Sequence, residues 1–332
     1  MNRIEGFGLA PTTAAFVASY DQNRGWNQGK WMEPGEQLKI PLQASVLSYG
    51  LSVFEGLKAY RTVKDTILLF RVRDHAERFQ RSAKAVGLPT FPVEKFVQTC
   101  RDTALRNAAH LPPVGKGSLY LRPVLFANEA RLGMGLPATA RFVLFASPVS
   151  EYFQGSEQGV SLLLLDRSRV PAGGIGYAKC SGNYAGTLLT RVQAMHDGYD
   201  DVLYCDARNP GTVAELTGAN IFARIDETLV VTPPASDQIL AGITRDSVIH
   251  LMRDQGVNVE ERPLTITELT AAQESFCTGT AWGVVGVREL RHGSSSIRFP
   301  TMQLSHQLVK KLQAVQTGER ADPFDCELIP FE

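Results

Sequence analysis

The feature that most constrains the fold is the alternation of short strand-like segments with helix-like segments. Residues 66–70 (TILLF) predict a strand, and residues 74–87 after it predict a helix that starts near Asp74 and ends at Gly87. Residues 118–127 and 140–149 are rich in β-branched and aromatic side chains, so they predict two more strands. Since no internal repeat interrupts the alternation, we expect an α/β (α+β) fold.

A second run of strands begins after Pro148. Short apolar segments there are separated by turns and by one helical segment, and they occupy residues 161–166, 201–206, 219–226 and 228–234. The chain has 332 residues, enough for two domains. We therefore predict a smaller N-terminal domain over residues 1–145, with a loop at about 127–140, and a larger C-terminal domain over residues 146–332.

Composition excludes several classes of function. The 34 basic and 34 acidic residues balance, which argues against a nucleic-acid surface or a polybasic membrane patch. No apolar run approaches the roughly 20 residues of a membrane helix, and the first twenty residues show no secretory signal. Five cysteines without a CxxC pair and six scattered histidines predict neither disulfides nor a metal site. We expect a protein of the reducing cytoplasm.

Lys179 is unusual because its neighbours in YAKCSGNYAG are small and uncharged. The nearest formal charges along the chain are Arg169 and Arg191. A lysine in such a setting can lose its proton near neutral pH and react with an aldehyde. The alternative is a lysine whose ammonium group simply reaches water.

Three further segments could hold polar parts of one ligand. In LAGITRDSVIHLM, Thr244 marks the expected start of a helix, which is either an anion site or an ordinary cap. In AELTGANIF, Glu215 could keep a ring nitrogen protonated, or it could be a loop acid in water. In SFCTGTAWG, Thr280 could contact an anion or merely form a turn. An amine, a carboxylate and a phosphate cup are together what pyridoxal phosphate requires.

These motifs, in this order and spacing, resemble the fold-type-IV pyridoxal-phosphate enzymes and most closely the branched-chain amino-acid aminotransferase family. The segments LSYGLSVFEGLKAY, LFRVRDHAERFQRSA and LYLRPVLF extend the resemblance into the N-terminal half. The resemblance covers roughly residues 40 to 320. It implies two domains with pyridoxal 5'-phosphate between them and a homodimer that exchanges amino groups between branched-chain L-amino acids and 2-oxoglutarate.

The resemblance also implies roles for single residues. Lys179 would bind the cofactor covalently and move a proton during catalysis, and Glu215 would pair with the pyridine nitrogen. Tyr184 would contact the phenolic oxygen, and Arg78, rather than Arg81, the phosphate. The other expected phosphate-binding residues are Ile243, Thr244 and Thr280. The expected substrate-binding residues are Tyr49, Phe54, Tyr120, Arg122, Met134, Leu136, Tyr152, Thr280 and Ala281. Arg122 would receive the side-chain carboxylate of glutamate, while Tyr49, Met134 and Leu136 would reach the partner subunit's site.

Three positions depart from the family's usual pattern: Ser181, Ala219 and Ala241. None is one of the residues expected to hold the cofactor, so the chemistry is expected to be intact while the substrate stays open. The alternatives are a specialised biosynthetic transaminase for an unusual 2-oxo acid, a D-amino-acid transaminase and an aminodeoxychorismate lyase. A binding protein that kept the fold without activity is a further alternative, against which Lys179 and Glu215 both argue.

Overall fold

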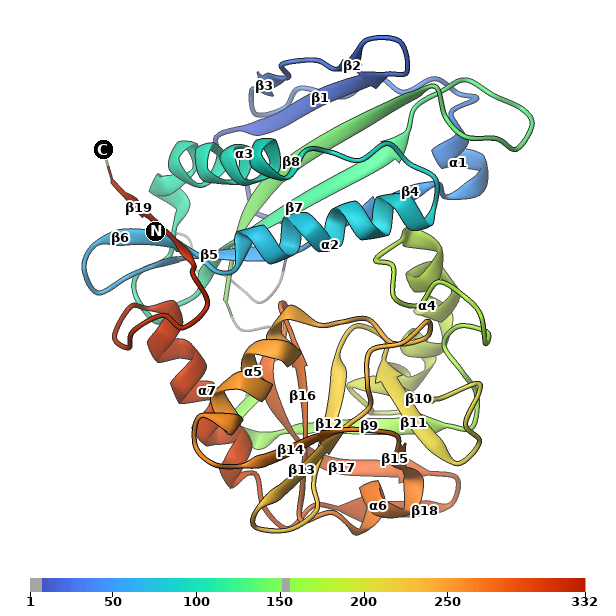
Figure 1. Cartoon of the computed structure of the whole chain (residues 1–332), viewed down its shortest axis with the longest axis vertical. Coiled ribbons are helices and arrows are strands. Elements are labelled where there is room, and N and C mark those ends of the chain that lie inside the picture. The colour runs from blue at the N-terminus through green and yellow to red at the C-terminus, as the bar shows by residue number, and fades with distance from the viewer. Residues whose placement is uncertain (1–7, 151–155, 332) are drawn as a thin grey trace. The chain divides into compact units, whose positions relative to one another are not determined.

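The computed structural model describes residues 8–150 and 156–331, and the chain divides into two compact units (Figure 1). Unit 1 comprises Met1–Glu151, Ala178–Gly182 and Ala314–Glu332, whereas unit 2 comprises Tyr152–Tyr177 and Asn183–Gln313. Unit 1 thus includes the short segment around Lys179 and the C-terminal end of the chain. The predicted boundary at residue 145 stays a prediction.

Unit 1 contains an antiparallel sheet. Within the described residues it has nine strands in the order β19-β6-β5-β7-β8-β1-β2, with β3 paired to β1 and β4 paired to β7. The strands are β1 (Ala15–Asp21), β2 (Gly25–Trp26), β3 (Lys30–Met32), β4 (Ser52–Phe54), β5 (Leu57–Arg61), β6 (Thr66–Leu69), β7 (Ser118–Ala127), β8 (Thr139–Val149) and β19 (Glu327–Pro330). The strands expected at 66–70, 118–127 and 140–149 are therefore present.

The described helices of unit 1 are α1 (Ser45–Tyr49), α2 (Val72–Ala85), α3 (Val93–Arg106) and the 3-10 helix η1 (Ala108–His110). Helices α2 and α3 pack against one face of the sheet. Phe79 of α2 and Phe96 of α3 both contact the ring of Phe142 in β8, at centroid distances of 5.8 and 6.1 Å. Burial of such aromatic side chains provides much of the driving force for folding of the unit.

The other face of the sheet presents a different set of side chains near Lys179. Phe142 pairs with Leu125 across β7 and β8, so Leu125 and Leu121 point toward the helices. Because side chains alternate along a strand, Tyr120 and Arg122 must point to the opposite face. Phe54 of β4 joins them there, since it lies opposite Val124 in the ladder. The pleat of the strands thus gathers these side chains on one surface.

Unit 2 is built on a second, mixed sheet of ten strands within the described residues. The order is β14-β13-β12-β16-β17-β9-β10-β11-β15, with β18 paired to β17. Its strands are β9 (Val160–Leu165), β10 (Asp201–Cys205), β11 (Thr212–Leu216), β12 (Asn220–Arg224), β13 (Leu229–Thr232), β14 (Asn258–Glu261), β15 (Leu264–Thr265), β16 (Glu274–Gly279), β17 (Gly283–His292) and β18 (Ser295–Arg298). An additional pairing of Glu215 with Asn220 joins β11 to β12 and closes a ring of strands.

Four helices and one short 3-10 turn complete the described part of unit 2. They are α4 (Ser181–His196), α5 (Ile243–Arg253), α6 (Ile266–Ala271), α7 (Gln303–Gln316) and η2 (Ser156–Gln158), although α4 begins and α7 ends with residues of unit 1. Apolar side chains from the ring of strands, among them Leu203, Ile221 and Val285, form the main core of the unit.

Two predicted helix starts were wrong in detail. Helix α2 begins at Val72 and not at Asp74, because Arg71 takes a left-handed conformation with φ of 52° and turns the chain into the helix. Asp74 accepts a hydrogen bond from Arg71 Nε at 2.8 Å instead of capping the helix. Helix α5 follows Gly242, so Thr244 lies inside the first turn.

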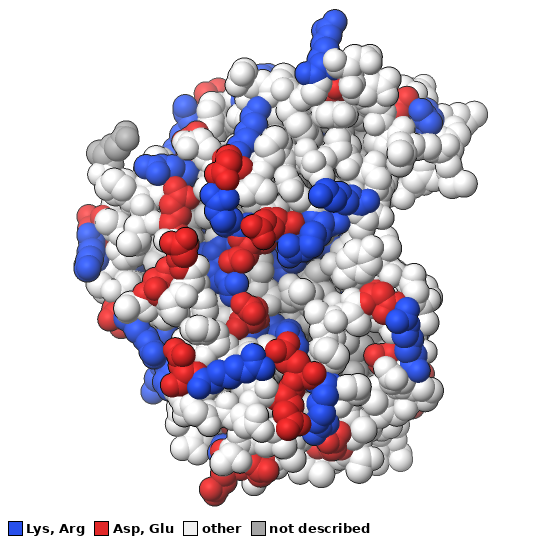
Figure 2. Space-filling view, viewed as in Figure 1, with Lys and Arg blue, Asp and Glu red and all other residues white. Residues whose placement is uncertain are grey.

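Acidic and basic side chains are interspersed on the face shown in Figure 2. This distribution is what equal numbers of both signs would be expected to give. Among the described residues, none of the helices combines the length and apolar character that a membrane crossing requires.

Candidate active site

Lys179 is fixed in unit 1 by its backbone. Its N–H donates to Ser82 Oγ at 2.9 Å, and its carbonyl accepts from the Phe54 N–H at 3.0 Å. The next residue, Cys180, forms a β-bridge with Val53. The ammonium nitrogen lies 4.7 Å from the centre of the Phe54 ring, within the range of a cation–π contact. The segment is thus held between β4 and α2, and its half-buried amine lies against the Phe54 ring.

Arg78 is buried in a network that the sequence did not reveal. Its Nε and one terminal nitrogen donate to the two oxygens of Glu55 at 2.7 and 2.9 Å, and His75 Nδ1 donates to the same carboxylate at 2.8 Å. Although burial alone would raise the pKa of the Glu55 carboxyl, the Arg78 charge and the His75 hydrogen bond hold it well below its ordinary value. Burial lowers the pKa of His75, so the ring is neutral near pH 7 and donates its proton to Glu55.

The predicted substrate residues of unit 1 separate into two groups. Phe54, Tyr120 and Arg122 lie together: the Arg122 guanidinium is 5.0 Å from the Phe54 ring and donates to the Tyr120 hydroxyl at 3.2 Å. Since Lys179 contacts this group through the Phe54 ring, four predicted site residues share one surface.

The second group comprises Tyr49, Met134 and Leu136, and these side chains are solvent-exposed in the single chain. The Tyr49 hydroxyl donates to the carbonyl of Leu132 at 2.6 Å, which attaches the end of α1 to the loop between β7 and β8. The structure does not bring this group to Lys179. Tyr152 lies outside the described residues.

Glu215 is the centre of the candidate site in unit 2. It is 4% exposed, and one carboxylate oxygen forms an ion pair with Arg169. The other oxygen accepts from Asn220 Nδ2 at 3.3 Å and from the Leu240 N–H at 3.2 Å. The positive charge of Arg169 favours the ionised carboxylate, which is the form that can hold a proton on a ring nitrogen.

The start of α5 is linked to Glu215 through Asn220. A side chain at Gly242 would place its Cβ 2.1 Å from Asn220 Oδ1, so the turn that leads into α5 needs a glycine for space. Asn220 also donates to the carbonyl of Leu240 at 3.0 Å. The acid of β11 and the first turn of α5 are thus held by one side chain.

Hydroxyl groups in unit 2 fit a phosphate ligand. Thr244 is 6% exposed, and its side chain is bonded to no other described residue. On β16 the hydroxyl of Thr278 is buried and also lacks a partner among the described residues. The first turn of a helix and buried hydroxyls without a partner are suitable donors for an anion. Thr280 and Ala281 follow in the turn between β16 and β17.

Tyr184 and the departures from the family pattern have ordinary local contacts. Tyr184 lies in α4 and its carbonyl accepts from the Thr187 hydroxyl at 2.8 Å. The Ser181 hydroxyl shares a hydrogen bond of 2.7 Å with Ser52 Oγ, which ties the Lys179 segment to β4. Ala219 belongs to the apolar core of unit 2, whereas Ala241 is exposed. None of these contacts removes a residue of the candidate site.

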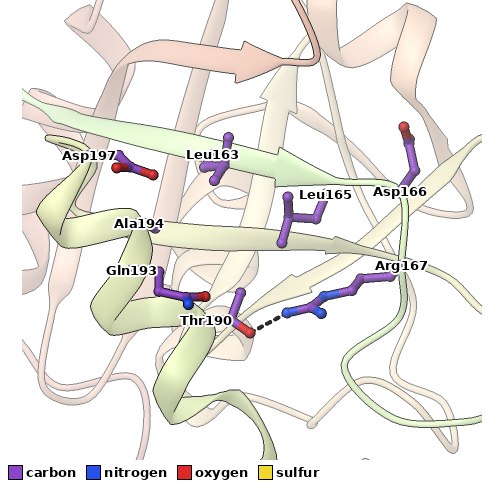
Figure 3. A pocket seen from close by; sticks show the side chains of 8 residues that line it. All are labelled: Leu163, Leu165, Asp166, Arg167, Thr190, Gln193, Ala194 and Asp197. Atoms are coloured by element: carbon purple, nitrogen blue, oxygen red, sulfur yellow. Dashed lines mark hydrogen bonds between the residues drawn. The ribbon is translucent and has the colours of Figure 1, made fainter.

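Figure 3 shows a separate hollow on unit 2, between α4 and the strand β9. Its volume is about 390 Å³, and Arg167 donates to the Thr190 hydroxyl at its edge. The lining residues are Leu163, Leu165, Asp166, Arg167, Thr190, Gln193, Ala194 and Asp197. None of them is among the predicted site residues or their hydrogen-bond partners described above.

The sequence missed four supporting residues: Glu55, His75, Arg169 and Asn220. Two signals were available. Glu55 lies inside the motif LSVFEGLKAY, directly after Phe54, and Arg169 is the charge nearest to Lys179 on its N-terminal side. Neither position reveals its partner, because the contacts join residues that are distant along the chain.

Comparisons with known proteins agree with this geometry. Residues 52–290 match the family model described as amino-transferase class IV. The chain is 36% identical over 316 residues to the mitochondrial branched-chain amino acid aminotransferase 1 of Humulus lupulus, covering 94% of this chain and 80% of that protein. It is 38% identical over 322 residues to the chloroplastic branched-chain-amino-acid aminotransferase 5 of Arabidopsis thaliana, covering 95% and 77%.

A solved structure shows the same fold. The branched-chain amino acid aminotransferase of Escherichia coli has a TM-score of 0.83 and 26% sequence identity, and the match covers 97% of this chain and 100% of that chain. The predicted fold class and the family resemblance are therefore confirmed.

Proposed function

Because the chain belongs to the class IV aminotransferases and, within them, to the branched-chain amino acid aminotransferases, we propose that it transfers the amino group of leucine, isoleucine or valine to 2-oxoglutarate. The cofactor is pyridoxal 5'-phosphate, whose aldehyde and electron-withdrawing ring supply the chemistry of amino-group transfer. The observation that supports this assignment most directly is the surface of unit 1, where Lys179, Phe54 and Arg122 lie together.

Lys179 has the central chemical role in this proposal. Its Nζ takes a proton from the substrate α-carbon and later returns one, so it acts as general base and then as general acid. The backbone hydrogen bonds to Ser82 and Phe54 keep the amine in one place throughout. Holding a reacting group in position in this way lowers the entropic part of the barrier.

The remaining site residues bind and orient. Glu215, kept charged by Arg169, holds a proton on the pyridine nitrogen, and Tyr184 bonds the phenolic oxygen. Arg78, Ile243, Thr244 and Thr280 hold the phosphate. Charge-assisted hydrogen bonds of this kind are roughly twice as strong as neutral ones. The proposed receptor for the substrate carboxylate is the pair of backbone N–H groups at Thr280 and Ala281.

The proposed pocket accepts two kinds of side chain. Burial of a leucine side chain against Phe54 and Tyr120 contributes about 1.5–3 kcal/mol when complete. Arg122 receives the distal carboxylate of glutamate or 2-oxoglutarate, since its guanidinium is held by aromatic groups. A ping-pong reaction needs both properties at one site.

We also propose that the enzyme is a homodimer. Leu188, Leu189 and Met195 of α4 are 60%, 69% and 51% exposed in the single chain, as is the group of Tyr49, Met134 and Leu136. Exposed apolar patches of this kind mark protein interfaces. A second copy of the chain would cover them and would bring the second group to its active site. Sedimentation should give a dimer mass for the wild type and a shift toward monomer for Leu189→Lys.

The proposed compartment is the cytoplasm, which is reducing. All five cysteines are described and none forms a disulfide. The two curated relatives carry mitochondrial and chloroplastic names. Cell fractionation decides: cytosolic recovery supports the proposal, and recovery with an organelle contradicts it.

A donor panel tests the function. We expect L-leucine to transfer its amino group to the enzyme-bound cofactor and to yield the matching 2-oxo acid in equal amount. The transfer would be followed as loss of the absorbance of the bound aldehyde form. D-Alanine and 4-amino-4-deoxychorismate should leave the spectrum unchanged. A reaction with D-alanine and not with L-leucine would indicate a D-amino-acid transaminase. A reaction with 4-amino-4-deoxychorismate and not with L-leucine would indicate an aminodeoxychorismate lyase. Failure of all three would favour a transaminase for an unusual 2-oxo acid.

A further inference from the structure

Gly56 separates β4 from β5, and the space beside it is filled by Tyr120. A Cβ atom on Gly56 would lie 1.6 Å from the Tyr120 hydroxyl oxygen and 2.5 Å from its Cζ. The φ of Gly56 is not in the left-handed region, so the position requires a glycine for space and not for backbone conformation. The Tyr120 hydroxyl therefore occupies the volume that any side chain at residue 56 would need.

The backbone at this point is held on several sides. The Glu55 N–H donates to the carbonyl of Pro123 at 2.9 Å, and the Gly56 N–H donates to the Glu55 carboxylate at 3.1 Å. That carboxylate is itself held by the buried Arg78 and His75. A methyl group added at Gly56 would consequently displace the Tyr120 side chain more readily than the backbone.

Tyr120 in turn holds Arg122. The guanidinium donates to the Tyr120 hydroxyl at 3.2 Å and lies 5.3 Å from the centre of the Tyr120 ring. No carboxylate among residues 8–150 and 156–331 forms an ion pair with Arg122, and its Nε is buried without a partner in the same residues. An arginine held by hydroxyl and aromatic groups alone keeps its charge available for an anionic ligand.

We propose that Gly56 is a specificity-determining position. Because residue 56 has no side chain, the Tyr120 hydroxyl can occupy the space beside it. Tyr120 in turn positions Arg122 for the side-chain carboxylate of glutamate or 2-oxoglutarate. Gly56 is thus a positioning residue that acts through Tyr120 and touches no substrate itself. The inference rests on the proposed transaminase function, because only that function requires one pocket to alternate between an aliphatic and a dicarboxylate substrate.

The direct test is Gly56→Ala in the full-length holoenzyme. Single-turnover kinetics would give the half-saturating concentrations of L-leucine and L-glutamate separately. We expect the value for L-glutamate to rise about tenfold or more, as loss of a charge-assisted contact predicts, and the value for L-leucine to change less than about threefold. A purely structural effect of the methyl group would weaken both substrates alike.

Further variants show whether the effect passes through Tyr120. Tyr120→Leu removes the atoms that the new methyl group would meet, so adding Gly56→Ala to Tyr120→Leu should change the L-glutamate value by less than about twofold. Gly186→Ala is the matched control, since its added Cβ meets nothing within 4 Å and should leave both substrates unaffected. If Gly56→Ala does not fold, Tyr120→Phe removes only the hydroxyl and should show the same selective loss of L-glutamate.

Several outcomes would overturn the inference. One such outcome is that Gly56→Ala raises the half-saturating concentrations of L-leucine and L-glutamate equally. Another is that the L-glutamate value stays unchanged in a folded Gly56→Ala or Tyr120→Phe variant. Either result would show that the position of the Tyr120 side chain does not determine specificity. If the wild type uses L-leucine and L-glutamate normally in that experiment, the proposed function stands and only the role of Gly56 fails. A wild type that uses neither amino acid would refute both.

Discussion

Among the described residues, each unit contains a buried arginine–glutamate pair, in which we propose that one member binds the ligand and the other supports it. In unit 1 the proposed ligand-binding partner is Arg78, and Glu55 supports it. In unit 2 the proposed ligand-binding partner is Glu215, and Arg169 supports it. In both cases the supporting residue of opposite charge keeps the other one ionised in a buried place, where an unpaired charge would be costly.

Burial of an arginine–glutamate pair therefore does not reveal which of its two residues binds the ligand. All four side chains are at most 5% exposed, so exposure does not distinguish them. Their remaining partners do not distinguish them either. Glu55 shares its carboxylate between Arg78, His75 and the Gly56 N–H, all in unit 1, and Glu215 shares its carboxylate between Arg169, Asn220 and the Leu240 N–H, all in unit 2. The proposed roles therefore have to be separated by substitution.

The largest effect expected within this comparison comes from making the same substitution in both pairs. Glu215→Gln should lower kcat at saturating cofactor by at least about 100-fold, since the ring nitrogen loses its charged partner. Glu55→Gln should lower kcat by less than about tenfold under the same conditions, because Glu55 is not among the residues proposed to contact the ligand. Steady-state kinetics with L-leucine would measure both values.

Stability provides the control for this pair of variants. Each substitution leaves a buried arginine without its counter-charge, so each should reduce the free energy of unfolding by about 3 kcal/mol or more in urea titrations. Equal losses of kcat in the two variants would contradict the proposed roles.

A smaller effect is expected for cofactor affinity when Arg78 is removed. Arg78→Ala should raise the dissociation constant of pyridoxal 5'-phosphate by about 10- to 100-fold, through loss of a charge-assisted phosphate contact. Titration of the apoenzyme with cofactor, followed by fluorescence, would measure it. Arg81→Ala is the matched control, because Arg81 lies one turn further along α2 and is more than half exposed. Unchanged affinity in Arg78→Ala would assign the phosphate to other groups.

The smallest expected effect is on the pH dependence of stability. It compares Glu55, whose carboxylate is paired with Arg78 at hydrogen-bond distance, with Asp201, whose nearest cation is farther away. Asp201 in β10 is buried, and its nearest cation, Arg191 Nε, lies 3.5 Å away. Burial raises the pKa of Asp201 to about 6, whereas the ionised Glu55 has a pKa below its ordinary value. Since the folded protein binds a proton at Asp201 more readily than the unfolded chain does, this group favours folding at low pH and loses that contribution as pH rises through about 6.

The test compares the wild type with Asp201→Asn, which cannot titrate. Between pH 7.5 and pH 5, the contribution of Asp201 should increase wild-type stability by about 1 kcal/mol relative to the variant. Urea unfolding at the two pH values would measure the difference. A difference of opposite sign would contradict the raised pKa. Glu55 should lose its own contribution only in more acidic solution, below the pKa of an unfolded glutamate.

The sequence predicted the ligand-facing residues better than their supports. Lys179, Glu215 and Thr244 stand in short motifs of small residues, because a ligand requires particular groups at particular spacings. Arg169 lies 46 residues from Glu215, and Glu55 lies 23 residues from Arg78. Such contacts depend on strand pairing, which one sequence without relatives does not determine.

Fold details follow the same pattern. The strands at 66–70 and 118–127 could be predicted from their composition. The pairing of β19 with β6 could not, since it joins the C-terminal end of the chain to the edge of the first sheet. The start of α2 was missed because Arg71 adopts a left-handed conformation that non-glycine residues seldom take.

Lys179 provides the most direct test of the account. Wild-type holoenzyme mixed with one equivalent of L-leucine should release one equivalent of 2-oxo acid in a single turnover, and Lys179→Ala with the same amount of bound cofactor should release it at least about 10³-fold more slowly. Release at the wild-type rate by Lys179→Ala would show that another group moves the proton, and the assignment of this amine would then be wrong.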